Sequence, residues 1–151
     1  MKRILLIEDD TTLRETTAEI LELENYEVIT AANGEKGVEL AKLVTPDLII
    51  CDIMMPEMDG YQVLEILSSN TKTQRIPFIF MSAKTEMTEV RKGMDLGADD
   101  YLTKPVNEEL LFSAIQSRLA KAELLKEREK EAKEEEINKD ENNYNNINSI
   151  D

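Results

Sequence analysis

Three short, unbroken apolar runs constrain the fold of this chain more than any other feature of its sequence. They are ILLI (Ile4–Ile7), LIIC (Leu48–Cys51) and FIFM (Phe78–Met81). Continuous apolar runs of this length are typical of strands covered on both faces, which occur in parallel sheets lying between two layers of helices. Two weaker runs, Glu27–Ala31 and Asp100–Thr103, complete a predicted set of five strands.

Helical patterns separate the predicted strands. Apolar residues recur at helical spacing in five segments. These segments begin after the Asp- and Thr-rich residues 10–12, at Gly34, at Asp59, at Thr85 and at Asn107. Gly97 is placed to end the fourth helix and Asn107 to cap the fifth. Strand and helix alternate five times, which predicts an α/β fold: a three-layer, doubly wound (βα)5 sandwich with a parallel five-stranded sheet.

The final helix has no clear end in the sequence. Its apolar stripe continues to Leu125 and then fades into KEREKEAKEEE (126–136), which favours a helix but has no apolar face. The Asn-rich segment that follows has the composition of a disordered tail. We therefore expect a globular domain over residues 1–120, a charged helical extension or linker over 121–136, and a disordered tail over 137–151.

Composition excludes several kinds of site. The chain has one cysteine, Cys51, and no histidine, so an intrachain disulfide, a Cys/His zinc site and a Ser-His or Cys-His catalytic pair cannot form within it. The net charge is −14, and residues 1–119 carry most of it, with 22 acids and 12 bases. Such a domain is unsuited to direct nucleic-acid binding, which depends on Lys and Arg. It suits a divalent cation or a basic partner.

The sequence predicts neither a membrane segment nor a signal peptide. No apolar run approaches the roughly 20 residues that cross a bilayer, and the acids at 8–10 interrupt the first run too early for a signal sequence. We expect a cytoplasmic protein without membrane contact.

Polar and charged residues follow the predicted strands at the point where each strand ends. In an open parallel sheet, ligands bind beyond the carboxyl ends of the strands, so these side chains are expected on one rim. They are Glu8, Asp9 and Asp10 after the first strand, Asp52 after the third, Ser82 after the fourth and Lys104 after the fifth.

Asp52 is the member of this set that a purely structural role explains least, because burying an unpaired carboxylate is unfavourable. Close to Glu8 and Asp9 it would also meet like charges, and a hard cation is the simplest compensation. Mg²⁺ binds one or two carboxylates with several waters, and such sites are typical of phosphate chemistry. For the other residues simpler roles stay open: a helix cap for the first acids, a loop hydroxyl for Ser82 and a surface cation for Lys104.

Four segments together resemble the receiver domain of bacterial two-component response regulators, a CheY-like domain. They are ILLIEDD, PDLIICDIMMPEMDG, PFIFMSA and GADDYLTKP, and the resemblance covers about residues 2–119. Ser82, Tyr101 and Lys104 follow Asp52 by 30, 49 and 52 residues, which is the spacing of that family. The resemblance implies a flavodoxin-like fold with strand order 2-1-3-4-5 and a phosphoprotein of phosphorelay signal transduction.

The resemblance also assigns the chemistry. Asp52 is expected to be the phosphoacceptor, forming an aspartyl phosphate with a phosphoryl group from the histidine of a sensor histidine kinase or phosphotransfer protein. Lys104 and Ser82 are expected to contact that phosphoryl group. Ser82 stands where Thr is commoner in the family, and the Lys104-Pro105 peptide bond is expected to be cis.

The metal expected from the resemblance is Mg²⁺, with Mn²⁺ as the alternative. Its predicted ligands are Asp9, Asp52, Glu8 and the backbone carbonyl of Met54. Glu8 stands where Asp is commoner in the family, and both residues supply a carboxylate.

By resemblance, phosphorylation moves Ser82 toward the phosphoryl group and rotates Tyr101 inward. The surface formed by the predicted helix at 85–96, the strand at 100–103 and the last helix then changes and controls a partner or output domain. On this interpretation the chain is not a turnover enzyme, although it assists its own phosphorylation and dephosphorylation.

Several alternatives remain at this stage. The chain could be a stand-alone receiver or the receiver part of a longer transcription factor or hybrid kinase. A phosphorylation-dependent homodimer stays open, although Ser113 stands four residues after Glu109, where dimerising regulators often carry Arg. A haloacid-dehalogenase-like Mg-dependent phosphatase is the remote alternative, but it requires a second Asp at the position of Met54.

Overall fold

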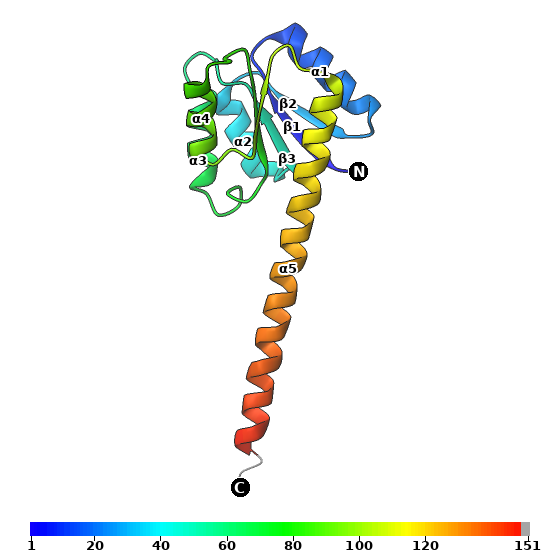
Figure 1. The fold of residues 1–151 in the computed structure, drawn as a ribbon, viewed down its shortest axis with the longest axis vertical. Helices are drawn as coiled ribbons and strands as arrows, with labels where there is room; N and C mark the ends of the chain where they lie inside the picture. Colours follow the sequence, from blue (N-terminus) through cyan, green and yellow to red (C-terminus); the bar gives the residue numbers. More distant parts are fainter. Residues whose placement is uncertain (149–151) are drawn as a thin grey trace. The chain divides into compact units, whose positions relative to one another are not determined.

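The computed structural model describes residues 1–148, in which five strands and five helices alternate along the chain (Figure 1). The strands are β1 (Arg3–Ile7), β2 (Glu27–Ala31), β3 (Leu48–Cys51), β4 (Phe78–Ser82) and β5 (Asp100–Thr103). The helices are α1 (Thr11–Leu23), α2 (Gly34–Val44), α3 (Gly60–Ser68), α4 (Met87–Asp95) and α5 (Glu108–Asn148). The strands pair in parallel in the order β2-β1-β3-β4-β5, so the predicted fold class and strand order are confirmed.

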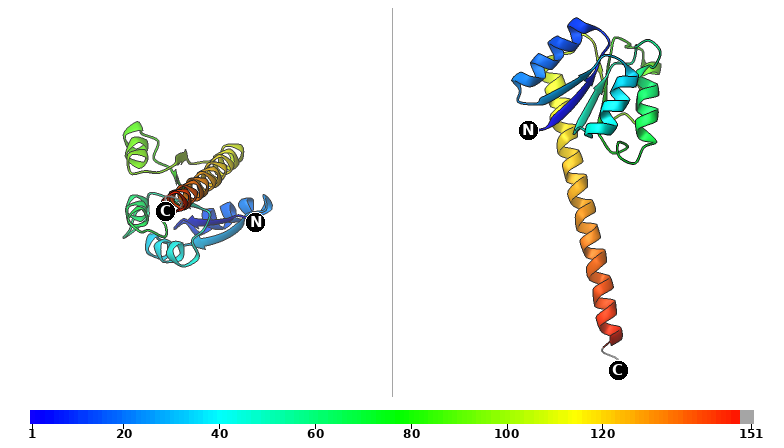
Figure 2. Two further views of the ribbon diagram at one scale, coloured as in Figure 1. Left: turned by 90° about the horizontal axis from the view of Figure 1, so that it is seen from below. Right: turned by 180° about the vertical axis from the view of Figure 1, so that it is seen from behind.

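The two faces of the sheet carry separate apolar cores, as the continuous apolar strands predict. On one face, alternate strand residues such as Ile49 share a core with Val38 of α2 and Leu64 of α3. On the other face, residues such as Ile50 share a core with Leu21 of α1 and Ile115 of α5. The helices accordingly lie in two layers with the sheet between them (Figures 1 and 2).

Side-chain caps lie at the starts of four helices, α1, α2, α3 and α5. Asp10 Oδ1 accepts from the backbone N of Leu13 at 2.9 Å at the start of α1. Asp59 and Gln62 form a reciprocal capping box at the start of α3, with both bonds at 2.9 Å. Asn107 caps α5 as predicted. These helices follow β1, β2, β3 and β5 along the chain, so each cap marks the end of a loop that begins at the carboxyl end of a strand.

Two boundaries differ from the sequence prediction. Helix α4 begins at Met87 and not at Thr85. Helix α5 continues to Asn148, whereas the sequence predicted a disordered tail from residue 137; residues 149–151 lie outside the described part. Once a helix exists, each further residue adds a hydrogen bond, and Asn costs less than about 0.7 kcal/mol relative to Ala. The Asn-rich composition therefore does not by itself end the helix.

The chain divides into two units, Met1–Leu119 and Ala120–Asp151. The first contains the whole sheet and both cores, and the second contains the remainder of α5. Within residues 1–148, the structure contains no helix that combines the length and apolar composition needed to cross a bilayer.

Candidate functional site

Two buried carboxylates lie side by side at the carboxyl ends of the central strands. Ile7 of β1 pairs with Cys51 of β3, so the next residues, Glu8 and Asp52, are neighbours. The backbone N of Asp52 donates to the carbonyl of Ile7 at 3.0 Å, which extends the sheet ladder past the last strand residues. Glu8 is 1% exposed and Asp52 6%. Their position is therefore set by the hydrogen bonds of the sheet.

Asp9 completes a cluster of three acids. Oxygen atoms of Glu8, Asp9 and Asp52 all lie within 4.8 Å of one another, and Asp9 is the most accessible of the three. The neighbouring Asp10 instead caps α1, so the helix-cap role that was open for the first acids belongs to Asp10. The cluster offers only hard oxygen donors from an accessible rim, a donor set that fits Mg²⁺ or Mn²⁺.

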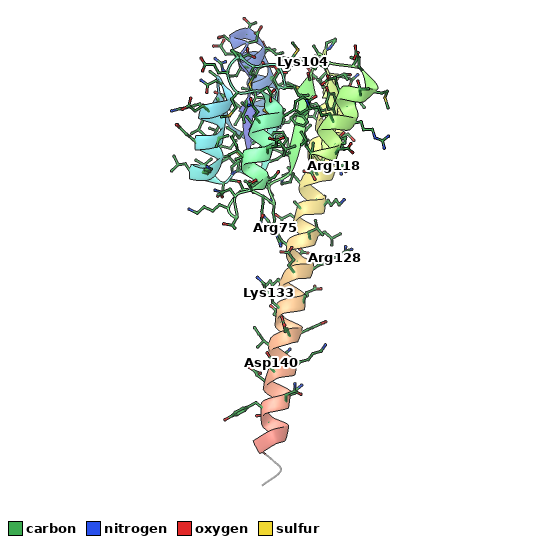
Figure 3. All side chains as sticks on the ribbon, turned by 90° about the vertical axis from the view of Figure 1, so that its left-hand side faces the viewer. Arg75, Lys104, Arg118, Arg128, Lys133 and Asp140 are labelled. Atoms are coloured by element: carbon green, nitrogen blue, oxygen red, sulfur yellow. The ribbon has the colours of Figure 1, made fainter. Side chains whose placement is uncertain are left out.

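Lys104 compensates part of this negative charge. Its Nζ lies 2.5 Å from Glu8 Oε1 and 3.5 Å from Asp52 Oδ1. The Lys104-Pro105 peptide bond is cis, which is the geometry that the resemblance predicted. Figure 3 labels Lys104 at the end of the domain where the strands terminate. Lys104 is therefore paired with buried acids and is not an exposed surface cation.

Burial and charge act in opposite directions on Glu8. Burial raises the pKa of the Glu8 carboxyl above its ordinary value, and the neighbouring charge of Asp52 adds to this rise. The hydrogen bond and charge of Lys104 oppose it, as does the bond from the backbone N of Asp10. The site thus carries more negative charge than its one lysine balances, and a divalent cation would relieve the excess.

The backbone around the site has little freedom. Arg14 Nη1 donates to the carbonyl oxygens of Glu8 at 2.8 Å and Asp9 at 3.4 Å, and so ties α1 to the end of β1. The start of α3 approaches so closely that a Cβ atom at Gly60 would lie 2.3 Å from the carbonyl oxygen of Asp52. Sequence reasoning did not select Arg14. Its position six residues after Glu8, on the first helix, was the available signal.

Ser82 and Tyr101 lie on the neighbouring strands. Ser82 is fully buried at the end of β4, and its Oγ accepts from the backbone N of Lys84 at 3.2 Å. The Tyr101 hydroxyl donates to the carbonyl oxygen of Lys84 at 2.8 Å, and its ring packs partly buried against the core near Phe80. The tyrosine is thus turned toward the β4–α4 loop. Met54, the predicted carbonyl ligand, lies two residues after Asp52 with an exposed side chain.

Comparison with known proteins decides which family has this arrangement. Residues 4–116 match the response regulator receiver domain. This chain belongs to the response regulator receiver family. As a receiver domain, it is a signalling module of two-component systems, and its flavodoxin-like fold is the fold of CheY-like proteins.

The curated relatives of this receiver are of two sizes. Protein PilH of Pseudomonas aeruginosa is 39% identical over 120 residues, which are 80% of this chain and 99% of PilH. The DNA-binding dual master transcriptional regulator RpaA of Synechocystis is 37% identical over 123 residues, which are 82% of this chain but 51% of RpaA. The receiver therefore spans nearly all of PilH and about half the length of RpaA and of other regulators that it matches.

Solved structures agree with the family. Chemotaxis protein CheY4 of Vibrio cholerae superposes with a TM-score of 0.74 at 28% identity, covering 78% of this receiver and 98% of CheY4. A CheY-like receiver domain protein of Methanospirillum hungatei superposes with a TM-score of 0.76 at 32% identity, covering 82% of this receiver and 97% of that chain.

Proposed function

We propose that this receiver is a phosphorylation-activated switch whose phosphoacceptor is Asp52. The observation that carries the proposal is the position of Asp52 between Lys104 Nζ, 3.5 Å from its Oδ1, and the carboxylates of Glu8 and Asp9. The donor would be the phosphohistidine of a sensor histidine kinase or phosphotransfer protein. The matches reported above give no support to the haloacid-dehalogenase alternative.

In the transfer, a carboxylate oxygen of Asp52 bonds to phosphorus as the bond from phosphorus to the histidine nitrogen breaks. The imidazole keeps that electron pair and takes up a proton. Because charge spreads over the phosphoryl oxygens in the transition state, the protein acts mainly by positioning and neutralising. Lys104 would supply a cation, and Ser82 would donate its hydroxyl to a phosphoryl oxygen.

The residues that would hold Mg²⁺, or Mn²⁺ as the alternative, are Glu8, Asp9, Asp52 and the backbone carbonyl of Met54. When bound, the ion would supply positive charge to the phosphoryl oxygens. Two features of the site support this assignment: the donor set is all oxygen, and Lys104 alone leaves the three acids incompletely compensated.

The expected consequence of phosphorylation is a change at the surface formed by α4, β5 and α5, led by Ser82 and Tyr101. The similarity over nearly the whole length of PilH supports a stand-alone receiver. Such a receiver would act on a separate partner protein, and we expect it in the cytoplasm. The similarity to half of RpaA supports the alternative that an output domain belongs to the same protein. A phosphorylation-dependent homodimer is a third use of the same surface.

The test is phosphorylation by acetyl phosphate, read by intact-protein mass. With Mg²⁺ the wild-type chain should gain one phosphoryl group that is labile to hydroxylamine, and chelation of the metal should prevent the gain. Asp52→Asn should abolish the adduct, while Asp95→Asn, a matched change at an exposed acid of α4, should retain it. The same adduct on Asp52→Asn would refute Asp52 as the acceptor.

A further inference from the structure

Helix α4 has little side-chain burial of its own. Gly93 is the buried residue within Met87–Asp95, and the N-cap Glu86 makes no side-chain hydrogen bond to the helix. The backbone instead lies directly on core aromatics: a Cβ atom at Gly93 would be 3.0 Å from a ring carbon of Phe80 and 3.3 Å from one of Tyr101. Elements with few buried apolar groups open most readily, so contacts from other elements matter for the position of α4.

Tyr61, at the start of α3, supplies such contacts. Its ring is buried and packs edge-to-face on Phe80, with 5.5 Å between the ring centroids. Its hydroxyl donates to Glu89 Oε2 at 2.6 Å and lies 3.3 Å from the carbonyl oxygen of Glu89. Lys92 Nζ lies 4.4 Å from the centroid of the Tyr61 ring, a cation–π arrangement. One side chain of α3 thus contacts the first two turns of α4.

The Tyr61 hydroxyl is a dependable donor. Burial, followed by the hydrogen bond to Glu89, raises the pKa of Tyr61 well above its ordinary value. The phenol therefore keeps its proton throughout the physiological range, and the bond to Glu89 has a charged acceptor, which makes it stronger than a neutral pair.

Lys84 connects this cluster to Tyr101. Its Nζ lies 3.6 Å from Glu89 Oε2, the same oxygen that Tyr61 binds. Its carbonyl oxygen accepts from the Tyr101 hydroxyl at 2.8 Å, and its backbone N donates to Ser82 Oγ at 3.2 Å. A continuous set of contacts therefore runs from Tyr61 through Glu89 and Lys84 to both predicted switch residues.

The cluster also borders the phosphoacceptor loop. Tyr61, Lys84 and Lys92 line a surface pocket of about 410 Å³ together with Met54 and Met55, which follow Asp52. A displacement of that loop and a displacement of α4 would therefore both alter the surroundings of Tyr61, Lys84 and Lys92.

We propose that Tyr61 is a positioning residue of the switch, which holds α4 and Lys84 through Glu89 and so couples the position of α4 to the orientation of Tyr101 in which its hydroxyl binds the Lys84 carbonyl. The inference rests on the proposed function, since it concerns how the phosphoryl signal reaches α4. Tyr61 itself lies outside the acidic cluster and makes none of its contacts with the reacting carboxylate.

The first experiment measures amide hydrogen exchange by NMR in the full chain, without any phosphodonor. Tyr61→Phe removes only the hydroxyl and keeps the ring on Phe80. It should speed exchange of residues 84–92 at least about threefold. The matched control, Tyr26→Phe, makes the same chemical change in a ring that packs against the other core and should leave residues 84–92 unchanged.

Coupling to Tyr101 is tested with a double-mutant cycle. The effects of Tyr61→Phe and Tyr101→Phe on exchange of residues 84–92 should be non-additive, because the Tyr101 hydroxyl holds Lys84 directly and the Tyr61 hydroxyl holds it through Glu89. Glu89→Gln keeps an acceptor for Tyr61 and removes the charge that pairs with Lys84, so in that background the two effects should become additive. Unchanged exchange in Tyr61→Phe, additive effects in the wild-type background, or a uniform rise across the domain would overturn the proposal.

A third experiment distinguishes failure of this inference from failure of the proposed function. Beryllofluoride with Mg²⁺, a phosphoryl mimic, should alter exchange at residues 84–92 in the wild-type chain and alter it less in Tyr61→Phe. A wild-type chain that does not respond contradicts the proposed function, whereas the cycle measured without the mimic tests the coupling by itself. An equal response in both chains contradicts the role of Tyr61 in the switch.

Discussion

The ammonium of Lys104 lies between two carboxylates that burial alone would disfavour. It contacts Glu8 at 2.5 Å and Asp52 at 3.5 Å, while the two acids are almost fully excluded from water. A pair of buried like charges is tolerated only where a cation is shared between them. At the scale of single residues, Lys104 is thus the cation that the two buried acids share.

Replacing Lys104 by Met should lower the stability of the fold. The substitution keeps most of the side-chain volume but leaves Glu8 and Asp52 without their cation, so the free energy of unfolding at pH 7 should fall by about 2–4 kcal/mol. Added Mg²⁺ should recover part of the lost stability. The affinity of the variant for Mg²⁺ should not be lower than that of the wild type, because the Lys104 ammonium competes with the metal for the same acids. Urea unfolding and calorimetric titration measure the two quantities.

The matched control for this prediction is Lys36→Met. Lys36 forms an exposed pair with Glu39 at 3.7 Å, and its loss should change stability by less than about 0.5 kcal/mol. Equal stability losses in the two variants would contradict the charge argument.

The Glu89 carboxylate gives a prediction about pH. Its hydrogen bond from Tyr61 is the main cause that lowers the pKa of Glu89 below 4.5. The folded state therefore binds this proton less tightly than the unfolded state, and the stabilisation is present above pH 4.5 and lost as pH falls through the lower folded value. The stability difference between wild type and Glu89→Gln should be constant above that window and should shrink below it, as measured by urea unfolding at several pH values. A difference that grows with acidity would contradict the assignment.

Site residues could be predicted from the sequence where their place in the chain, at the end of a strand, also fixes their place in the fold. Glu8, Asp52 and Lys104 each come directly after a strand, and Asp9 follows Glu8. A correct sheet therefore places all four on one rim without further information. Tyr61 and Glu89 could not be found this way. They lie 28 residues apart on two helices, and their contact depends on where α3 and α4 pack, which no local pattern encodes.

At the scale of elements, the site depends on how closely α3 approaches the end of β3. The backbone N of Gly60 donates to the carbonyl of Ile53 at 2.8 Å, and the capping box of Asp59 with Gln62 fixes the first turn. This leaves no room for a side chain at Gly60. The start of α3 and the loop that follows Asp52 therefore form a single unit.

Gly60→Ala should disrupt that unit. Its Cβ atom would meet backbone atoms, 2.3 Å from the Asp52 carbonyl oxygen and 2.8 Å from Ile53 Cα, and backbone cannot yield as a flexible side chain can. We expect a loss of at least about 2 kcal/mol in unfolding free energy and slower phosphorylation by acetyl phosphate, because Asp52 is displaced. Thermal unfolding and mass measurements check both; full stability with a normal rate would show that the loop can move aside.

The elements also show where sequence patterns fail. The continuous apolar strands and the capping residues were sufficient to predict the five strands, the sheet order expected from the resemblance, and the start of α5. The end of α5 was not predictable, because residues 126–148 have no apolar face whose fading could mark a boundary. The composition of a segment indicates whether it can bury apolar side chains. It does not indicate where a helix that is exposed on all sides ends.

At the scale of the whole molecule, both cores are complete within the first unit. Leu119 is the last residue along the described chain that belongs to either core, and it is also the last residue of that unit. The sheet, the acidic cluster and the Tyr61 contacts all lie before it. Folding of the receiver should therefore not require the charged part of α5.

A chain that ends after Leu125 should keep the stability of the full chain. Because the removed residues belong to neither core, the melting temperature should change by less than about 3 °C, and phosphorylation by acetyl phosphate should proceed at the same rate. Circular dichroism at 222 nm should lose the helical signal of the removed segment. A large drop in melting temperature would mean that the extension stabilises the receiver.

The positions of Tyr61 and Tyr101 on either side of Lys84 have a practical consequence for spectroscopy. The chain has four tyrosines and no tryptophan. Two report on the Lys84 contacts, Tyr26 packs against the opposite core, and Tyr144 is exposed in the second unit. Uniform incorporation of fluorotyrosine would thus give four resonances in one sample: two for the switch, an internal reference for the domain and an independent probe of the extension.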